Sequence, residues 1–261
     1  MRNFDKKDAR RIKEPAELPE NLVMGRNAVI ELLKSGRSVD KVLLAKGAGE
    51  GSISMIEALA KGAGVPVVRV ERMKLDGMCA GGNHQGVAAL TAGVVYAEVA
   101  DILRIAEERG EPPFIVICDG IEDPHNLGAV IRCAEGVGAH GVIIPKRRSA
   151  GITPVTVKSS AGACEHIAIA KVTNLGSTID DLKEKGVWVY GAEADGSVLY
   201  DTDMKGAAAF VMGSEGSGIS HLVREKCDFM IRIPMYGHVN SFNVSTAAAV
   251  ILCEAAKQRN E

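Results

Sequence analysis

The stretch FIVICDGIEDPHNLGAVIR spans residues 114–132 and joins a continuous apolar run to a helical pattern through a polar loop. The apolar run lacks the alternation of a half-buried strand, so it is typical of a strand that is covered on both faces. The loop contributes Asn126, and the helical pattern that follows carries Arg132. Because ligands bind at the carboxyl ends of strands in open α/β sheets, this loop is a candidate site.

Further apolar runs alternate with helical patterns after this stretch and predict one parallel sheet with helices on both faces. The expected strands are GVIIP (141–145), HIAIA (166–170), VWVYGA (187–192), AAFVMG (208–213) and MIRIPM (230–235), with a last helix at 244–259.

Two more polar segments follow strands of this predicted sheet. SEGSGIS (214–220) places Glu215 among glycines, which let the backbone approach a ligand and expose its N–H groups. YGHVNSFNVS (236–245) places Ser241 and Asn243 before the last helix, where at least one polar residue is expected to be the N-cap. The sequence therefore predicts that three polar segments lie at the same end of the sheet.

The chain before this region predicts a smaller α/β unit at residues 22–93, with the polar residues 1–21 as a basic arm in front of it. Within the unit, His84 is expected in a turn. Residues 94–113 are expected to form a charged helical linker that ends at two prolines.

Charge and composition restrict the class of protein. The 261 residues carry a formal net charge of −2, yet basic residues gather in the arm and at Lys146, Arg147 and Arg148. These clusters predict either solvated surface or contacts with the phosphates of a nucleic acid, and both alternatives stay open. No apolar stretch reaches the roughly 18 residues of a membrane span, and the first residues contain no apolar signal core. We expect a cytoplasmic protein with no membrane contact.

The six cysteines are scattered without a C-x-x-C pair, which predicts reduced, mostly buried thiols and no metal site. Gly47, Gly49 and Gly51 follow a predicted strand, and Glu71 comes about twenty residues later, as in a dinucleotide-binding fingerprint. The third glycine is misplaced for that pattern, so we predict a plain glycine-rich turn. A Rossmann-type enzyme that uses these glycines remains an alternative.

Taken together, the three polar segments resemble the three motifs of the SpoU/TrmH family of RNA 2′-O-ribose methyltransferases. Residues 123–151, with HQGVAAL (84–90), resemble the RlmB-like branch, which methylates a guanosine of 23S ribosomal RNA. The resemblance implies that 114–261 form a SPOUT catalytic domain with a deep trefoil knot and that 22–93 form an L30e-like RNA-binding domain. It further implies S-adenosylmethionine as cofactor, large-subunit ribosomal RNA as partner, and a homodimer.

The resemblance also implies roles for individual residues. The expected catalytic residues are Asn126, Arg132, Glu215, Ser241 and Asn243, and the expected cofactor-binding residues are Gly213, Ile233, Met235 and Phe242.

Physical chemistry narrows the expected role of the arginine. A guanidinium stays protonated in proteins, so we expect Arg132 to bind a phosphate and to stabilise developing alkoxide charge rather than to act as a base. Glu215 could orient Arg132 or accept a hydrogen bond from the substrate, and Asn243 could hold Glu215 or the ribose. Taken singly, Arg132 reads as an ion-pair partner on a helix surface. A non-catalytic RNA-binding or ribosome-assembly factor with the same fold is the rival hypothesis.

Overall fold

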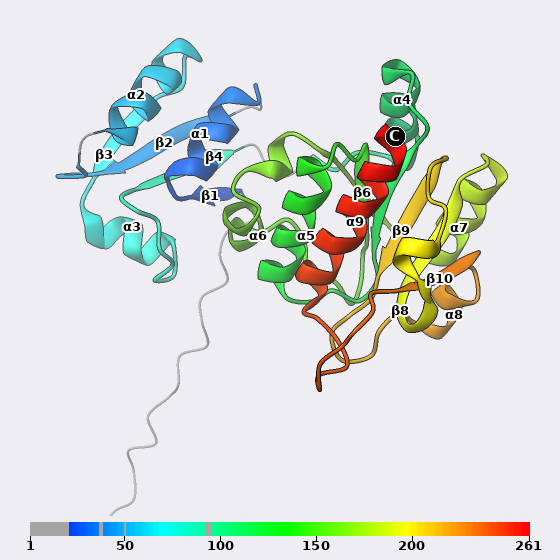
Figure 1. Cartoon of the computed structure of the whole chain (residues 1–261). Helices are drawn as coiled ribbons and strands as arrows, with labels where there is room; N and C mark the ends of the chain where they lie inside the picture. The colour runs from blue at the N-terminus through cyan, green and yellow to red at the C-terminus, as the bar shows by residue number, and fades with distance from the viewer. Residues whose placement is uncertain (1–20, 37–38, 50, 92–94) are drawn as a thin grey trace, which may run out of the picture.

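The computed structural model describes residues 21–36, 39–49, 51–91 and 95–261 (Figure 1). The predicted basic arm falls almost entirely on residues 1–20 and lies outside the described residues. Each of the two predicted α/β regions has its own sheet, and Figure 1 shows the two sheets side by side.

The first sheet has four strands in the order β1-β4-β2-β3. Strand β4 is antiparallel to β1 and β2, whereas β3 is parallel to β2. The elements of this region are β1 (Leu22–Met24), α1 (Arg26–Lys34), β2 (Val39–Ala45), α2 (Ser52–Gly62), β3 (Val67–Val70), α3 (Arg72–Met78) and β4 (Val87–Thr91). The glycines at 47–51 lie between β2 and α2, so a helix does begin directly after the third glycine.

The second sheet has six parallel strands in the order β10-β8-β9-β5-β6-β7, as the apolar runs predict. The strands are β5 (Phe114–Cys118), β6 (Gly141–Pro145), β7 (Ala168–Val172), β8 (Trp188–Val198), β9 (Ala208–Met212) and β10 (Phe229–Arg232). Every residue of β5 and β9 is buried, because these strands lie inside the sheet and are covered on both faces.

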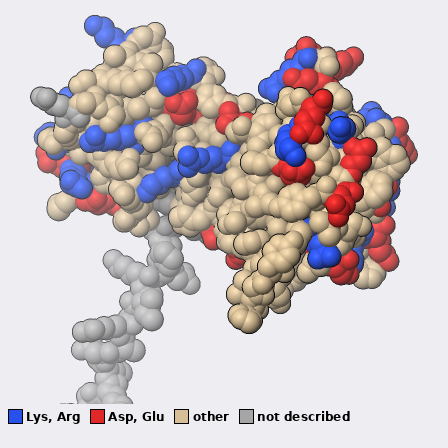
Figure 2. All heavy atoms as spheres, in the orientation of Figure 1, with Lys and Arg blue, Asp and Glu red and all other residues tan. Residues whose placement is uncertain are grey.

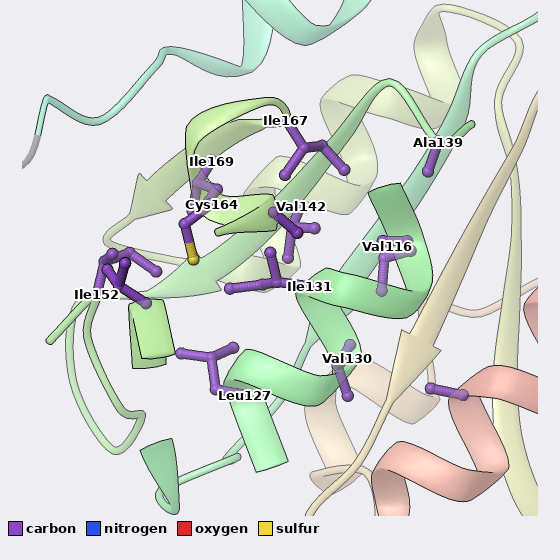
Figure 3. Packing of buried hydrophobic residues seen from close by; sticks show 14 of the residues in the cluster. Val116, Leu127, Val130, Ile131, Ala139, Val142, Ile152, Cys164, Ile167 and Ile169 are labelled. Atoms are coloured by element: carbon purple, nitrogen blue, oxygen red, sulfur yellow. The ribbon is translucent and has the colours of Figure 1, made fainter. Parts of the chain in front are cut away.

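Helices cover both faces of this sheet. They are α4 (Val99–Arg109), α5 (Pro124–Gly136), α6 (Pro154–Ser159), α7 (Leu175–Glu184), α8 (His221–Arg224) and α9 (Val244–Asn260). Alternate residues of β5 point to opposite faces: Phe114 and Val116 join the cluster of α5 and α9, whereas Ile115 and Ile117 join that of α4 and α7. Figure 3 shows α5 packed over Val116 by its buried side chains.

The first domain is docked on the second through β1 and α1, which contact α6 and the short 3-10 helix that follows it. Buried residues from both regions, such as Val29 and Val157, belong to one apolar cluster. The Glu31 Oε2 atom lies 2.9 Å from His166 Nε2 across this contact. A Cβ atom at Gly162 would lie 2.5 Å from the Cβ atom of Glu31, so the Gly162 backbone packs directly against the Glu31 side chain.

The cysteines depart in part from the prediction. Cys79, Cys118 and Cys164 are buried, but Cys253 is exposed on α9. Burial raises the pKa of the Cys118 thiol to about 12, so it stays protonated. Across the described ranges, no helix is both long enough and apolar enough to span a bilayer.

Candidate active site

A small, mostly apolar cavity lies at the carboxyl ends of β8, β9 and β10. Its volume is about 190 Å³. The predicted catalytic residues Glu215 and Ser241 line it. So do all four predicted cofactor-binding residues: Gly213, Ile233, Met235 and Phe242. The strand ends place these residues together because parallel strands all finish at one edge of the sheet.

Gly213 is required where the cavity wall is tightest. A Cβ atom at this position would lie 2.3 Å from the carbonyl carbon of Gly218, closer than real contacts allow. The loop that follows β9 is held there by Glu193, whose Oε1 atom accepts a 2.8 Å hydrogen bond from the Ile219 N–H. The loop backbone therefore forms the cavity wall directly, which fits a cofactor that is bound mainly by backbone groups.

A cluster of three polar side chains joins the three predicted motifs. Asn126 Nδ2 donates a 3.1 Å hydrogen bond to Glu215 Oε1, and Asn243 Nδ2 donates a 3.0 Å hydrogen bond to Asn126 Oδ1. Asn243 Nδ2 also donates to Glu215 Oε1. The carboxylate is thus oriented by two amides from segments far apart in the chain.

Helix capping explains why the two amides are in place. Asp123 is the N-cap of α5 and accepts a 2.8 Å hydrogen bond from the His125 N–H, and Pro124 occupies the first helical position. Asn243 is the N-cap of α9, where its Oδ1 atom accepts a 3.0 Å hydrogen bond from the Ser245 N–H. Capping uses the oxygen of Asn243 and leaves its NH₂ group for Glu215 and Asn126.

The structure does not bring Arg132 to this cluster within one chain. Its side chain is exposed and makes no hydrogen bond or ion pair with a described residue, and it lines neither cavity described here. Arg132 lies six residues after Asn126 on α5, which corresponds to about 120° around the helix axis and a rise of about 9 Å. The two side chains therefore point in different directions. Within one chain, Arg132 therefore lies apart from the cluster of Asn126, Glu215 and Asn243.

A second, larger and more polar cavity lies at the carboxyl ends of β5, β6, β7 and β9, and its volume is about 1180 Å³. We call it the polar groove. It shares Ser214, Glu215, Gly218 and Val244 with the apolar cavity, so the two spaces meet at the polar cluster. Sequence reasoning missed the wall formed by Asn174 and the start of α7, although an asparagine directly after a strand is an N-cap signal.

Other expectations concern metals and turns. The described residues contain no group of three or more His, Cys, Asp or Glu side chains arranged to hold a metal ion. His84 begins a turn in which its carbonyl accepts a 2.9 Å hydrogen bond from the Val87 N–H, and its buried ring contacts Asp76.

Comparisons with known proteins agree with this arrangement. The model of the SpoU rRNA Methylase family matches residues 113–253, and that of the RNA 2′-O ribose methyltransferase substrate-binding family matches residues 22–97. A Bacillus subtilis protein named as a TrmH family tRNA/rRNA methyltransferase, YacO, is 47% identical over 91% of this chain and 96% of its own length.

Solved structures with lower identity share the fold. The SpoU methyltransferase AviRb from Streptomyces viridochromogenes, in complex with the cofactor AdoMet, superposes with a TM-score of 0.78 at 24% identity, over 92% of this chain and 90% of that one. An AdoMet-bound rRNA methyltransferase from Sinorhizobium meliloti superposes with a TM-score of 0.72 at 22% identity, over 90% of this chain and 86% of that one.

The fold and the site therefore define an RNA 2′-O-ribose methyltransferase of the SPOUT class. The chain belongs to the SpoU rRNA methylase family.

Proposed function

We propose that this enzyme transfers a methyl group from S-adenosylmethionine to the 2′-hydroxyl of a guanosine in large-subunit ribosomal RNA. The observation that carries the proposal is the polar cluster of Asn126, Glu215 and Asn243, which lies where a small apolar cavity meets a large polar groove. Residues 123–151, which resemble the RlmB-like branch, support a guanosine of ribosomal RNA as the substrate.

The apolar cavity is the cofactor site. S-adenosylmethionine supplies a methyl group on a positively charged sulfur when it is bound. Ile233, Met235 and Phe242 offer apolar contacts, and Gly213 lets the loop backbone approach closely. Small-molecule sites combine an apolar lining with a few oriented polar groups, and this cavity has that character.

Glu215 is proposed to position the ribose. Its Oε1 atom accepts both amide hydrogen bonds, whereas Oε2 makes no hydrogen bond with a described residue. Oε2 is thus available to accept a hydrogen bond from the attacking 2′-hydroxyl. Holding a nucleophile in line with the methyl group lowers the barrier by several kcal/mol, because the entropy of alignment is lost on binding rather than during reaction.

Arg132 is proposed to act on the active site of a second copy of this chain in a homodimer. An uncharged projection at the lower edge of Figure 2 coincides with the segment that joins β10 to α9 in Figure 1. Its Tyr236 side chain is 96% exposed and its Val239 side chain is 67% exposed, which is unusual for apolar groups in a free monomer. Pairing of two chains through this region would cover them and place Arg132 near the partner.

Mixed dimers test the borrowed arginine. Arg132→Ala and Glu215→Ala chains, each inactive alone, should regain about a quarter of wild-type activity when they are unfolded and refolded together in equal amounts. Half of the dimers then contain both chains, and each such dimer has one site with both residues intact. No recovery in a sample that contains mixed dimers by mass spectrometry would contradict the sharing of residues between chains.

The path of the chain supports the trefoil knot that the family resemblance implies. Strand β10 lies at one edge of the sheet, yet α9, which follows it, packs along α5 beside the sheet's centre. The connecting segment also lines the apolar cavity against the loop after β9. We propose that this return passes through the loop, so that the knotted segments form the cofactor site.

The first domain and the basic arm are proposed to bind RNA away from the reacting ribose. The substrate-binding family match at residues 22–97 supports this role. Figure 2 shows Lys and Arg side chains spread over the surface of this domain. Contacts with phosphates position a nucleic acid without reading its sequence, so this domain would contribute affinity and register.

Alkaline hydrolysis of RNA tests the reaction. A ribose 2′-hydroxyl is the nucleophile in that cleavage, so 2′-O-methylation should leave one linkage resistant after treatment with enzyme and cofactor. Mapping ribose methylation in ribosomal RNA from cells with and without the gene should then show the loss of one guanosine site. An unbroken hydrolysis ladder with tight RNA binding would instead support the non-catalytic assembly factor.

A further inference from the structure

We propose that Arg147 and Arg148 form a clamp that grips a phosphodiester of the substrate RNA within the polar groove, next to the ribose to be methylated. The inference rests on the proposed function and adds to it a binding site for the RNA backbone in the catalytic domain itself. Both arginines lie in the loop between β6 and α6 and line the groove.

The size of the polar groove favours a polymer rather than a single small molecule. Its volume of about 1180 Å³ exceeds the roughly 300–1,000 Å³ of ordinary ligand sites. One end holds Asn126 and Glu215 of the polar cluster, and the opposite walls come from the loops after β6 and β7. A strand of RNA whose target ribose lies at Glu215 would therefore extend its backbone along the groove.

Among the described residues, the two arginines have no anionic partner, unlike Lys226 and Arg224 nearby. Lys226 also lines the groove, but it forms an ion pair with Asp180 at 2.5 Å. Arg224 on α8 is paired with Asp195 at 2.6 Å. Arg147 and Arg148, in contrast, form no ion pair or hydrogen bond through their side chains with any described residue. Their charge is available to a ligand.

The acidic groups of the groove are mostly engaged. Asp119 Oδ2 accepts a 2.7 Å hydrogen bond from the Ser220 N–H, and Asp123 caps α5. Their negative charges lie on the β5 side and would repel a phosphate there. A phosphate is therefore favoured on the β6 side, where the arginines lie.

The loop that carries the arginines is held in a defined shape. The Lys146 N–H donates to the Val172 carbonyl at 2.7 Å, and the Ala150 N–H donates to the Ile121 carbonyl at 2.8 Å. Between these anchors, Arg148 has a φ angle of +54°, which costs a non-glycine residue about 1 kcal/mol or more. A solvated loop gains nothing from that strain, whereas a binding loop gains a fixed direction for its side chains.

A guanidinium suits this ligand because its planar fork can donate two hydrogen bonds to the oxygens of one phosphate. Two adjacent arginines can thus hold one phosphodiester or two successive ones. The clamp would fix the register of the RNA strand relative to Glu215 without reading the bases.

The test compares Arg147→Ala/Arg148→Ala with a charge-matched control, Lys185→Ala/Lys205→Ala. The control lysines are exposed and lie in loops before β8 and β9, at the opposite end of the sheet. With the full-length enzyme and a ribosomal RNA fragment, the arginine variant should raise the KM for RNA by roughly tenfold or more, the equivalent of about 1.4 kcal/mol. Its affinity for cofactor should stay within a factor of two of wild type.

Salt dependence supplies a second readout that a loss of folding would not mimic. Removing two phosphate contacts should reduce the slope of log KM against log salt by about 1.4, since each contact contributes about 0.7 for single strands. Neutral methylphosphonate linkages placed one at a time near the target should weaken the wild type at one or two positions and leave the arginine variant unaffected there.

The outcomes separate the clamp from the proposed function. If wild-type enzyme methylates no ribose in any ribosomal RNA fragment, the proposed function is wrong, whatever the variants bind. If wild-type enzyme is active and the arginine variant matches the lysine control in KM and salt slope, the clamp is wrong and the function stands. Equal sensitivity of both proteins to every methylphosphonate would likewise overturn the clamp.

Discussion

The two halves of the carboxyl edge of the second sheet differ in size and chemistry. The half formed by β8, β9 and β10 encloses a mostly apolar cavity of about 190 Å³, whereas the half formed by β5, β6 and β7 borders a polar groove of about 1180 Å³. One half suits a compact cofactor and the other suits a charged polymer. A single sheet edge can thus offer separate spaces to two unlike substrates when the residues that contact both lie on the wall between the spaces.

Mutation of Glu215 on the shared wall should change the rate most. Glu215→Ala should lower kcat about 1,000-fold while cofactor and RNA each bind within a few-fold of wild type, because the carboxylate acts on the aligned reactants rather than on either alone. Single-turnover kinetics with separate binding titrations would measure this. Glu184→Ala, an exposed acid on α7, is the control. If Glu215→Ala weakens the binding of only one of the two ligands, Glu215 acts in that ligand's binding site and not on the shared wall.

The next effect concerns Arg132, which lines neither the apolar cavity nor the polar groove of its own chain. Arg132→Ala should lower kcat about a hundredfold with cofactor affinity unchanged, since a group that stabilises transition-state charge contributes on that scale. Arg132→Lys should recover little, because an ammonium lacks the planar fork. Methylation at the wild-type rate with saturating RNA would show that Arg132 is a surface residue and that the shared wall is sufficient.

Gly213→Ala should act on the cofactor half alone. The added Cβ atom would lie 2.3 Å from the Gly218 carbonyl carbon and must push the loop after β9 away. Overpacking of this kind costs about 1–3 kcal/mol, so the Kd for S-adenosylmethionine should rise roughly ten- to a hundredfold. Isothermal titration without RNA measures the change, and RNA binding by the same variant is the control. An equal loss of RNA affinity would show that the two halves are not separable.

The smallest effect lies outside both halves, at the contact between the domains. Hydrogen bonds from Lys34 and then His166 lower the pKa of Glu31, so its carboxylate stabilises the fold above the pKa of the unfolded chain and loses this effect as pH falls. Because the pair is partly exposed, Glu31→Gln should lower Tm by about 1–2 °C at neutral pH. The difference should shrink below about pH 4, as thermal unfolding at several pH values would show. Catalytic constants should not change.

Much of this arrangement follows from the sequence. Polar residues after apolar runs predict that Glu215 and Asn243 gather at the sheet edge, since parallel strands end together. The role of Arg132 stays a prediction. Helical periodicity separates it from Asn126 by about 120° around α5, so the motif alone does not show whether both residues serve the same chain's site.

Short elements escaped prediction for a different reason. Strand β1 has three residues, and α3 has seven with a glycine near its end and one buried side chain, Leu75. Neither is long enough to show a period of its own. Strand β1 pairs with β4 and contacts α6 of the second domain, whereas α3 buries Leu75 in the core of the first domain. The polar groove was also beyond prediction, because its walls come from four loops whose separation depends on the packing of the helices between them.

The contact between α1, β1 and α6 has a consequence for how the RNA is selected. Because Glu31 and Gly162 meet directly, the distance between the first domain and the polar cluster is set by an interface and not by the linker. The two domains therefore lie at a fixed distance from each other, and we expect the enzyme to select RNA whose folded shape bridges that distance. Inserting residues at positions 92–94, where the predicted linker begins, should leave site choice unchanged. A shift of the methylated nucleotide after such an insertion would show that the linker sets the distance.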